Sequence, residues 1–386
     1  MKGRAFLFSL AAGIGISLAA AGMAFASEKN GQSQWDLEQF DTESVDEYLS
    51  RNQPEGVELS FTDLVVHIGK GEGKQAAEKI GTAVRQALVS QVGKGSRMLG
   101  QVVLLGLLGA VFSGFAGIFP NGQLSETGFF VTYLMLFTCL SASFFQSIQI
   151  ASGVLNHLLE FMKALLPSFF LSVAFCGGSG AGAALYETTL GMVAVFQWLC
   201  LKGLLPMIKM YALLILAGKI TREDSLSRLT DLVGKSVQWG LKTITAVLLG
   251  FQLIQGMVLP SVDALGKGSL FRFLEAVPGI GQGARTVTQA VLGAGVLIKN
   301  AIGAAAVVIL AVISALPLIQ LGILAVLYHF CAALLEPVCD KRIVSCIHGI
   351  SMAHQLLIRL VWTSLVLFAV SLAILCAVTN VMYFAG

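Results

Sequence analysis

The stretch VPGIGQGARTVTQAVLGAGVLIKN, from Val277 to Asn300, decides between two very different folds. Its Gly279, Gly281 and Ala284 fit the spacing of a glycine loop that binds a dinucleotide. That spacing has meaning only when a buried strand precedes it and a helix of a βαβ unit follows it. The preceding residues 271–277 instead form an amphipathic segment that ends in a Pro-Gly turn. The sequence therefore argues against a nucleotide site, and we expect no cofactor.

The composition of the chain is that of an integral membrane protein. Of its 386 residues, 56% are hydrophobic and 12% are charged, and the mean hydropathy is +0.80. Soluble domains average about 25% charged residues. The net charge of +3 is small, and no long run of Lys or Arg offers a surface for nucleic acid. We therefore expect an all-α, polytopic membrane protein that binds no nucleic acid.

Residues 1–26 have the three parts of a secretory signal peptide. Basic residues precede an apolar core, and Ala24-Phe25-Ala26 gives the small-x-small pattern that signal peptidase recognises. The core from Ala5 to Ala20 is long for a signal, so an uncleaved membrane anchor is the alternative. In both cases, residues 27–97 are predicted to lie outside the cytoplasm.

Residues 27–97 form a polar region in which we expect short amphipathic helices. The first half is acidic and the second half is basic, and apolar residues recur at roughly helical spacing. Two interpretations are compatible with this pattern. The region is a small α-helical extracytoplasmic domain, or it is a surface that docks a partner.

Residues 98–386 form the predicted membrane domain, in which apolar segments follow one another with short polar breaks; about 20 residues cross a bilayer. We predict seven spans, give or take one, from segments near 98–119, 129–150, 154–176, 183–201, 204–220, 243–262, 301–335 and 356–379. The stretch with His157, Glu160 and Lys163 is alternatively an amphipathic helix in the interface. Residues 301–335 contain Pro317 and are either one kinked span or a tight hairpin.

The positive charges of the loops predict the orientation. Five basic residues lie in the loop Lys219–Lys242, and three lie in the segment Asp340–Arg359. We expect both to be cytoplasmic, which places Val277 to Asn300 on the outer side.

Two glycine-rich clusters predict breaks in the membrane helices. Residues 286–298 are too short to span unaided, so a broken or re-entrant segment is expected after the second cluster. Paired breaks of this kind point to a transport pathway. The alternative is that both are ordinary loops and close-packed helix ends. The residues concerned are Gly177, Gly178, Gly180, Pro278, Gly279 and Gly281.

Four charged residues lie in or near apolar segments, where a charge is costly and defaults to a functional hypothesis. They are Glu187, Lys209, Lys299 and Glu336. They line a pathway in the functional interpretation. In the structural interpretation, Lys209 reaches to the interface and Glu336 lies beyond the end of its span.

No residue pattern identifies an enzyme or a metal site. Cys339, Cys346, His348 and His354 are near one another in sequence, but the Cys-x6-Cys spacing matches no common zinc pattern. The stretch Gly69–Lys74 looks like a phosphate loop, yet the next residue is neither Ser nor Thr. The seven cysteines lie in the apolar part of the chain, and most are expected to be packing residues. We therefore predict a protein that is not an enzyme.

The order of these features resembles that of the stage III sporulation protein AE family of endospore-forming bacteria. Ala276–Gly281 leads into Thr286–Ala290 and Val296–Asn300, which is similar to the Pro-hydrophobic-Gly turn, Thr-rich stretch and Leu-Lys-Asn ending of that family. Ala332–Pro337 is similar to its Ala-rich helix end before Pro, and Gly177–Gly182 to its Ser/Gly-rich break.

The resemblance implies a role that the residues alone do not. Family members are permease-like subunits of a secretion-like trans-envelope channel complex that joins the mother cell to the forespore and sustains late forespore gene expression. The implied partners are the ring-forming proteins of that complex and its secretion-type ATPase, and the implied location is the mother-cell membrane around the forespore. Two alternatives stay open: a stand-alone secondary transporter for a small solute, and a purely structural membrane platform.

Overall fold

The computed structural model describes residues 43–52, 60–69, 100–104, 106–108, 110–111, 123–175, 179–218, 226–275 and 281–384. Every regular element in these ranges is a helix, which confirms the all-α prediction. The predicted signal peptide at residues 1–26 lies outside the described residues. The elements are α2 (Glu43–Asn52), α3 (Phe61–Gly69), α5 (Gln123–Phe175), α6 (Ser179–Trp198), the π-helical η2 (Leu199–Leu204), α7 (Leu205–Gly218), α8 (Ser227–Glu275), α9 (Gly281–Leu335) and α10 (Lys341–Phe384).

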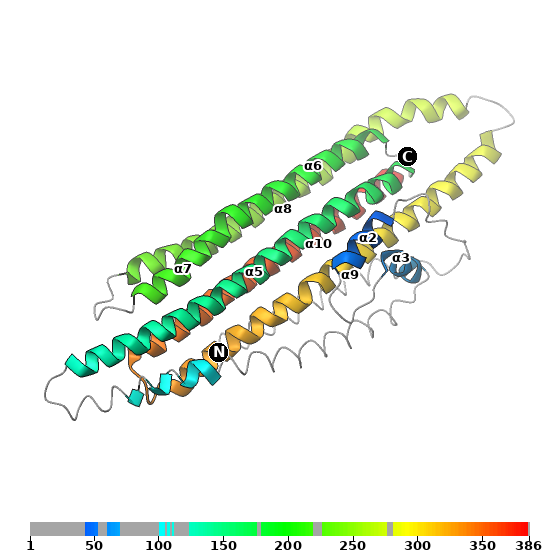
Figure 1. Cartoon of the computed structure of the whole chain (residues 1–386). Helices are drawn as coiled ribbons and strands as arrows, with labels where there is room; N and C mark the ends of the chain where they lie inside the picture. Colours follow the sequence, from blue (N-terminus) through cyan, green and yellow to red (C-terminus); the bar gives the residue numbers. More distant parts are fainter. Residues whose placement is uncertain are drawn as a thin grey trace.

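Five long rods run back and forth along one axis, namely α5, the joined α6–η2–α7, α8, α9 and α10 (Figure 1). The central rod is α10, which packs on α9, α8, α5 and α7. On one side of it, α9 packs on α10 and α5; on the other, α8 packs on α10, α7 and α6. Among the described residues, α8 has no substantial contact with α9 or α5. The bundle therefore has an α5–α9 side and an α8 side.

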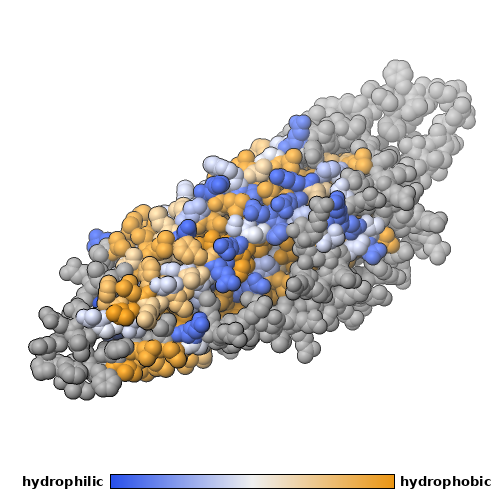
Figure 2. Space-filling model, viewed as in Figure 1, coloured by the Kyte–Doolittle hydropathy of each residue, from blue (hydrophilic) through white to orange (hydrophobic). Residues whose placement is uncertain are grey.

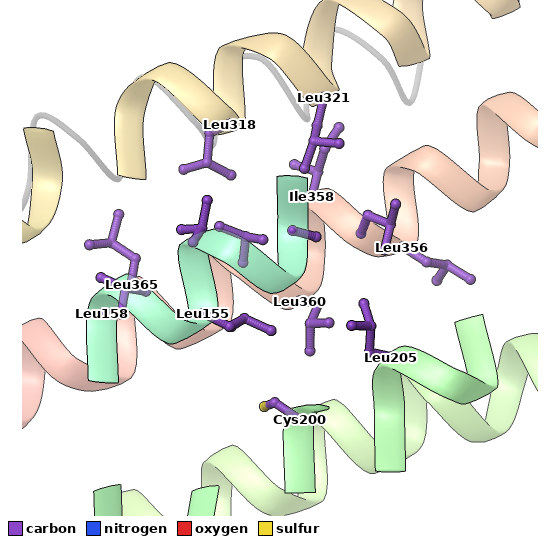
Figure 3. Packing of buried hydrophobic residues seen from close by; sticks show 14 of the residues in the cluster. Leu155, Leu158, Cys200, Leu205, Leu318, Leu321, Leu356, Ile358, Leu360 and Leu365 are labelled. Atoms are coloured by element: carbon purple, nitrogen blue, oxygen red, sulfur yellow. The ribbon is translucent and has the colours of Figure 1, made fainter. Parts of the chain in front are cut away.

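The core consists of leucine-rich faces that meet around α10. Figure 3 shows Leu155 and Leu158 of α5, Leu318 and Leu321 of α9, and Leu360 of α10 gathered in one cluster. All five are buried. Burial of a leucine side chain from water contributes about 1.5–3 kcal/mol, whereas in lipid the close packing itself supplies the attraction.

The boundaries predicted for several spans are wrong. In the described residues, five helices are long and apolar enough to cross a membrane: Thr127–Val173, Glu187–Gly218, Ser227–Gln255, Gly295–Leu335 and Lys341–Ala377. Several expected spans are halves of one rod. The first expected span, 98–119, is described only as helical pieces within residues 100–111.

The break expected between residues 150 and 154 does not exist, because α5 is one helix. His157, Glu160 and Lys163 lower the hydropathy there and suggested an interfacial amphipathic helix. Their neighbours Val154, Leu155, Leu158 and Phe161 are buried at helical spacing and continue the same face. Because this face is continuous, the helix continues through the polar stretch.

The predicted spans 183–201 and 204–220 are also joined. Between α6 and α7 the chain stays helical through η2, where the Leu205 N–H donates to the Cys200 carbonyl five residues back. Pro206 follows directly and has no N–H of its own. A single π-helical turn accommodates such a residue without a loop.

The broken or re-entrant segment predicted in the region of α9 is wrong, since this helix runs unbroken from Gly281 to Leu335. Residues 286–298 are part of this helix. Of the two alternatives for residues 301–335, the single span that contains Pro317 holds and the hairpin does not. One glycine of this helix serves close packing instead of a break. A Cβ atom added at Gly303 would lie 2.3 Å from the Sγ of Cys376 on α10.

The described parts of the two basic segments expected to be cytoplasmic are helical as well, while residues 219–225 lie outside the described residues. Residues 227–242 are the first part of α8, and residues 341–359 are the first part of α10. The side of the membrane on which they lie stays a prediction.

The two short helices α2 and α3 lie against the α5–α9 side of the bundle (Figure 1). The Tyr48 hydroxyl donates to the His157 carbonyl of α5 at 2.8 Å, and its ring lies 6.1 Å from that of Phe161. Burial, together with the nearby Glu160 carboxylate, raises the pKa of Tyr48. The expected amphipathic helices are therefore present in residues 27–97, and they dock on this chain's own bundle.

A carboxylate from α2 joins these two helices. Asp46 accepts hydrogen bonds from the Phe61 N–H at 2.5 Å and from the Thr62 N–H at 3.2 Å, both in the first turn of α3. The Ser60 hydroxyl caps the same turn by accepting from the Asp63 N–H at 3.2 Å. Free N–H groups at a helix start need such acceptors. We call α2 and α3 together the α2–α3 pair.

The contact between α10 and α7 gives a test of the packing. At Gly349 an added Cβ would lie 2.4 Å from Cγ2 and 3.5 Å from Cβ of Ile215, a stiff β-branched side chain that cannot swing away. We expect Gly349→Ala to lower the free energy of unfolding by about 1–3 kcal/mol. The measurement is thermal unfolding of the purified chain in detergent.

The matched control is Gly322→Ala on α9, where an added Cβ meets nothing within 4 Å. Because alanine favours a helix over glycine by up to about 1 kcal/mol, this variant should be as stable as the parent or more stable. Equal melting temperatures for the two variants would contradict the close approach of α10 and α7.

Candidate functional site

Three helices of the bundle meet at a cluster of polar side chains inside the apolar core. Ser143 and Ser147 lie one turn apart on α5, Tyr328 comes from α9 and His354 from α10. All four are buried, with Ser147 and His354 completely so. We call these four residues the polar seam.

The hydrogen bonds of the polar seam fix the state of the histidine. His354 Nδ1 lies 2.9 Å from the Ile350 carbonyl, which can only accept, so Nδ1 carries the proton. In the neutral ring, Nε2 is then an acceptor, and the Ser147 hydroxyl 2.9 Å away donates to it. The Tyr328 hydroxyl donates to Ser143 Oγ. The seam thus links α5 to both α9 and α10.

Aromatic rings enclose the His354 side chain. Phe144 meets it edge-on with ring centroids 5.3 Å apart, and the Tyr328 ring lies at the same separation with a tilt of 36°. Such contacts add to the burial of apolar area. The imidazole is therefore held on its faces by rings and at its two nitrogens by hydrogen bonds.

The chemistry open to the polar seam is limited by its burial. A serine hydroxyl that donates to a histidine is the nucleophile–base pair of many hydrolases. Here both groups are completely buried, and Nδ1 faces a backbone carbonyl instead of a carboxylate. The arrangement suits a link that fixes the relative position of three helices, with each hydrogen bond in a membrane interior contributing about 0.6–2 kcal/mol.

Lys299 lies elsewhere, on the part of α9 nearest Cys376 of α10. It is completely buried, and its ammonium is close enough to Cys376 to act on it electrostatically. Gly303, one turn along α9, gives the room for this close approach. Of the four charged candidates, Lys299 alone is buried.

The other three charged candidates are exposed and do not meet. Glu187 lies on α6, and Glu336 lies in the turn after α9. The Lys209 ammonium lies 4.9 Å above the ring of Phe145 on α5, a cation–π contact at the bundle surface. The structure therefore does not gather the predicted charges into one site.

The glycine candidates give no site in the described residues either. Gly177, Gly178, Pro278 and Gly279 lie outside them. Gly180 belongs to the first turn of α6, and Gly281 is the first residue of α9. Both are positions at a helix start.

The four Cys and His residues near the start of α10 have separate surroundings. Cys339 Sγ lies 3.2 Å from the Gly106 carbonyl, and the Tyr133 hydroxyl lies 3.5 Å from Cys346 Sγ. His348 packs on the ring of His329, and His354 belongs to the polar seam. Burial, with the neighbouring Asp340, raises the pKa of the Cys339 thiol. The described residues contain no group of three or more side chains that could hold a metal ion.

Sequence reasoning did not find the polar seam. Ser143, Ser147 and Tyr328 are common residues in apolar helices, and only His354 was a candidate, for a metal. The usable signal was Ser at i and i+4 on α5, because two hydroxyls on one face of an apolar helix point to a polar partner across the interface. The partner itself, 207 residues away from Ser147, is a tertiary contact.

Comparison with known proteins gives one family. A family model described as stage III sporulation protein AE matches residues 59–379. Among curated proteins, stage III sporulation protein AE of Bacillus subtilis (strain 168) is 24% identical over 265 residues. The match covers 68% of this chain and 66% of that protein, just under two thirds of its length. No solved structure matches the chain.

The polar seam is tested by Ser147→Ala. Removal of the hydroxyl leaves His354 Nε2 buried without its donor, so we expect a loss of about 1–2 kcal/mol in unfolding free energy. The measurement is thermal unfolding in detergent. Ser314→Ala on α9 is the control, since Ser314 is also completely buried but its hydroxyl has no hydrogen-bond partner. An equal effect of both changes would contradict the assigned bond.

Proposed function

The chain belongs to the stage III sporulation protein AE family, and on this premise we propose that it is a non-enzymatic, permease-like subunit of a trans-envelope channel complex. The complex links the mother cell to the forespore and supports late forespore gene expression. The role in sporulation follows from the family. The role in the channel is the proposal, and the next paragraphs give its support.

The observation that carries the proposal is that the described residues form five membrane-length helices packed around one apolar core. The seam where α5, α9 and α10 meet is closed by apolar packing and by the hydrogen bonds around His354. A chain with such a core contributes its outer faces to an assembly. A conduit to which it belongs is then formed between copies or with partner proteins, which suits a channel subunit better than a self-contained carrier.

The alternative of a stand-alone solute transporter loses its main support. Such transporters bind substrate at helices that are broken near the midplane. The break predicted at residues 286–298 is a continuous part of α9. The π-helical turn η2 interrupts the α-helical pattern but not the rod.

Partners and location belong to the same proposal. The α2–α3 pair turns polar residues such as Glu47 and Asp63 outward, which suits contact with ring-forming partners in the intermembrane space. The basic first part of α8 suits the mother-cell cytoplasm, where the secretion-type ATPase would act. The membrane concerned is the mother-cell membrane around the forespore.

A gene deletion in the spore-forming host tests this function. We expect loss of a late forespore-specific reporter and a shrunken forespore after engulfment, both restored by the unchanged chain. The reporter activity and the forespore volume are measured by microscopy. Normal reporter activity and normal volume in the deletion strain would refute the channel role.

Complementation with Lys299→Met tests whether the buried charge serves that role. Methionine keeps the length and the packing of the side chain but removes the ammonium. A buried charge costs stability, so its removal should leave the abundance of the protein normal. If the charge serves the channel, late reporter activity should fall. Lys163→Met, at an exposed lysine of α5, is the control. Full reporter activity with Lys299→Met would assign Lys299 to packing.

A further inference from the structure

Two histidines from different helices meet on the outside of the bundle. His329 of α9 and His348 of α10 lie with their ring centroids 5.1 Å apart and their planes at 49°. Both side chains are exposed. In sequence His348 is near two cysteines and His354, but its partner in space comes from the neighbouring helix. Imidazole is the commonest metal ligand of proteins. We call these two residues the histidine pair.

The packing of α9 on α10 fixes the distance between the two rings. One turn from each histidine, the buried Ser351 hydroxyl of α10 donates to the Ala325 carbonyl of α9 at 2.8 Å. Next to His348, Gly349 brings α10 close to Ile215 of α7. The backbones that carry the histidine pair are therefore held by contacts within one turn, as a preorganised binding site requires.

The ring nitrogens of the histidine pair are open to a ligand. Neither ring takes part in a hydrogen bond within the part of the chain that the structure describes. By contrast, both nitrogens of His354 are used in the polar seam, and His157 Nδ1 lies 3.4 Å from the Tyr48 hydroxyl. A neutral imidazole has one unprotonated nitrogen, whose lone pair binds a metal. The pair thus offers two such lone pairs side by side.

The separation of the two rings fits one metal ion of tetrahedral geometry. Zinc binds an imidazole nitrogen at about 2.0–2.1 Å, which places the ion roughly 3.2 Å from the centre of the ring. Two rings on one tetrahedral ion then have centres about 5.2 Å apart, whereas adjacent rings on an octahedral ion have centres about 4.5 Å apart. The observed 5.1 Å agrees with the tetrahedral value. Zinc is the metal whose protein sites most often have this geometry.

The charges near the histidine pair favour a cation. Glu336, in the turn after α9, is close enough to His348 for its carboxylate to act on the ring electrostatically. The Arg342 side chain is engaged elsewhere. Its guanidinium lies 3.6 Å from the centre of the Phe129 ring and pairs with Asp340 at 3.5 Å. A nearby anion, with the cation turned to other partners, lowers the cost of adding a positive ion.

The histidine pair lies near one end of the bundle on an otherwise apolar surface. His329 is six residues before the end of α9 and His348 is seven residues after the start of α10, roughly 10 Å along each helix. One turn away, Val326 and Met352 are exposed. On the face shown in Figure 2, apolar residues gather toward the end of the bundle at which α9 ends and α10 begins in Figure 1. Ionisable rings in such surroundings are by default a functional hypothesis.

We propose that His329 and His348 bind one zinc ion and form a reversible clip between α9 and α10. The described residues contain no group of three side chains that could hold a metal, so water completes the coordination. Two protein ligands bind zinc more weakly than the three or four of a resident centre. The site therefore fills and empties with the concentration of free zinc. When filled, it ties together the two helices that the Glu336–Asp340 turn connects. This inference does not depend on the channel role.

Zinc titration of the purified full chain in detergent tests the site. Zn²⁺ is the probe, and competition with a zinc-sensitive dye gives the affinity. We expect at least about tenfold weaker binding in His329→Gln and in His348→Gln, because loss of a ligand costs at least as much as loss of an outer partner. The control is His157→Gln on α5, which should bind zinc as the parent does. The native cysteines are the same in all four chains, so any zinc that they bind cancels in the comparison.

Two further measurements separate a zinc clip from simple packing of the two rings. Because zinc binds the native pair, saturating zinc should raise the melting temperature of the parent and of His157→Gln but of neither variant of the pair. Without zinc all four chains should melt alike, since both rings are exposed. Cobalt in place of zinc should give the intense visible absorption of a tetrahedral site in the parent alone among the parent and the two pair variants. Equal zinc affinity in the parent and either pair variant would overturn the proposal.

Discussion

The position of α10 at the centre of the bundle is the constraint on which the other helices depend. It packs on four rods, and at two places the fit leaves no room for a side chain. Those places are Gly349 against Ile215 of α7 and Gly303 of α9 against Cys376. Close backbone approach through small residues is the main source of attraction between helices in lipid. The polar seam fixes the register of the helices, because His354 meets the Ser147 hydroxyl of α5 and the Tyr328 ring of α9 only when both helices are aligned with α10.

The length of the rods follows from continuous buried faces. Polar residues interrupt the hydropathy of α5 at His157, yet Leu155, Leu158 and Phe161 keep the inner face apolar. On the outer face, the α2–α3 pair supplies Tyr48 as a hydrogen-bond partner. α6 and α7 also form one continuous rod, because the π-helical turn before Pro206 keeps the chain helical. Long helices with mixed outer faces result, and they set the geometry of the membrane contact.

The sequence was sufficient for the helical membrane class and for the family, but not for the spans or the site. Hydropathy averages all faces of a segment, so the outward residues around His157 hid an unbroken inner face. The short apolar run 286–298 suggested a re-entrant segment, whereas α9 continues through it and packs along α10. Lys299 was recognisable as an intramembrane charge, and the structure buries it. The partners of His354 depend on contacts between distant segments, which no local pattern encodes.

The polar seam also sets an order of events during synthesis. Ser143 and Ser147 belong to the first long rod, while Tyr328 and His354 follow 185 and 207 residues later. At about 5–20 residues per second, the ribosome takes roughly 10–40 s to deliver the last of these partners. Until then the two hydroxyls rest on their own helix, as Ser147 can on the Ser143 carbonyl. The early helices are therefore locked together only once α10 is made, because a chain without His354 lacks the partner of Ser147.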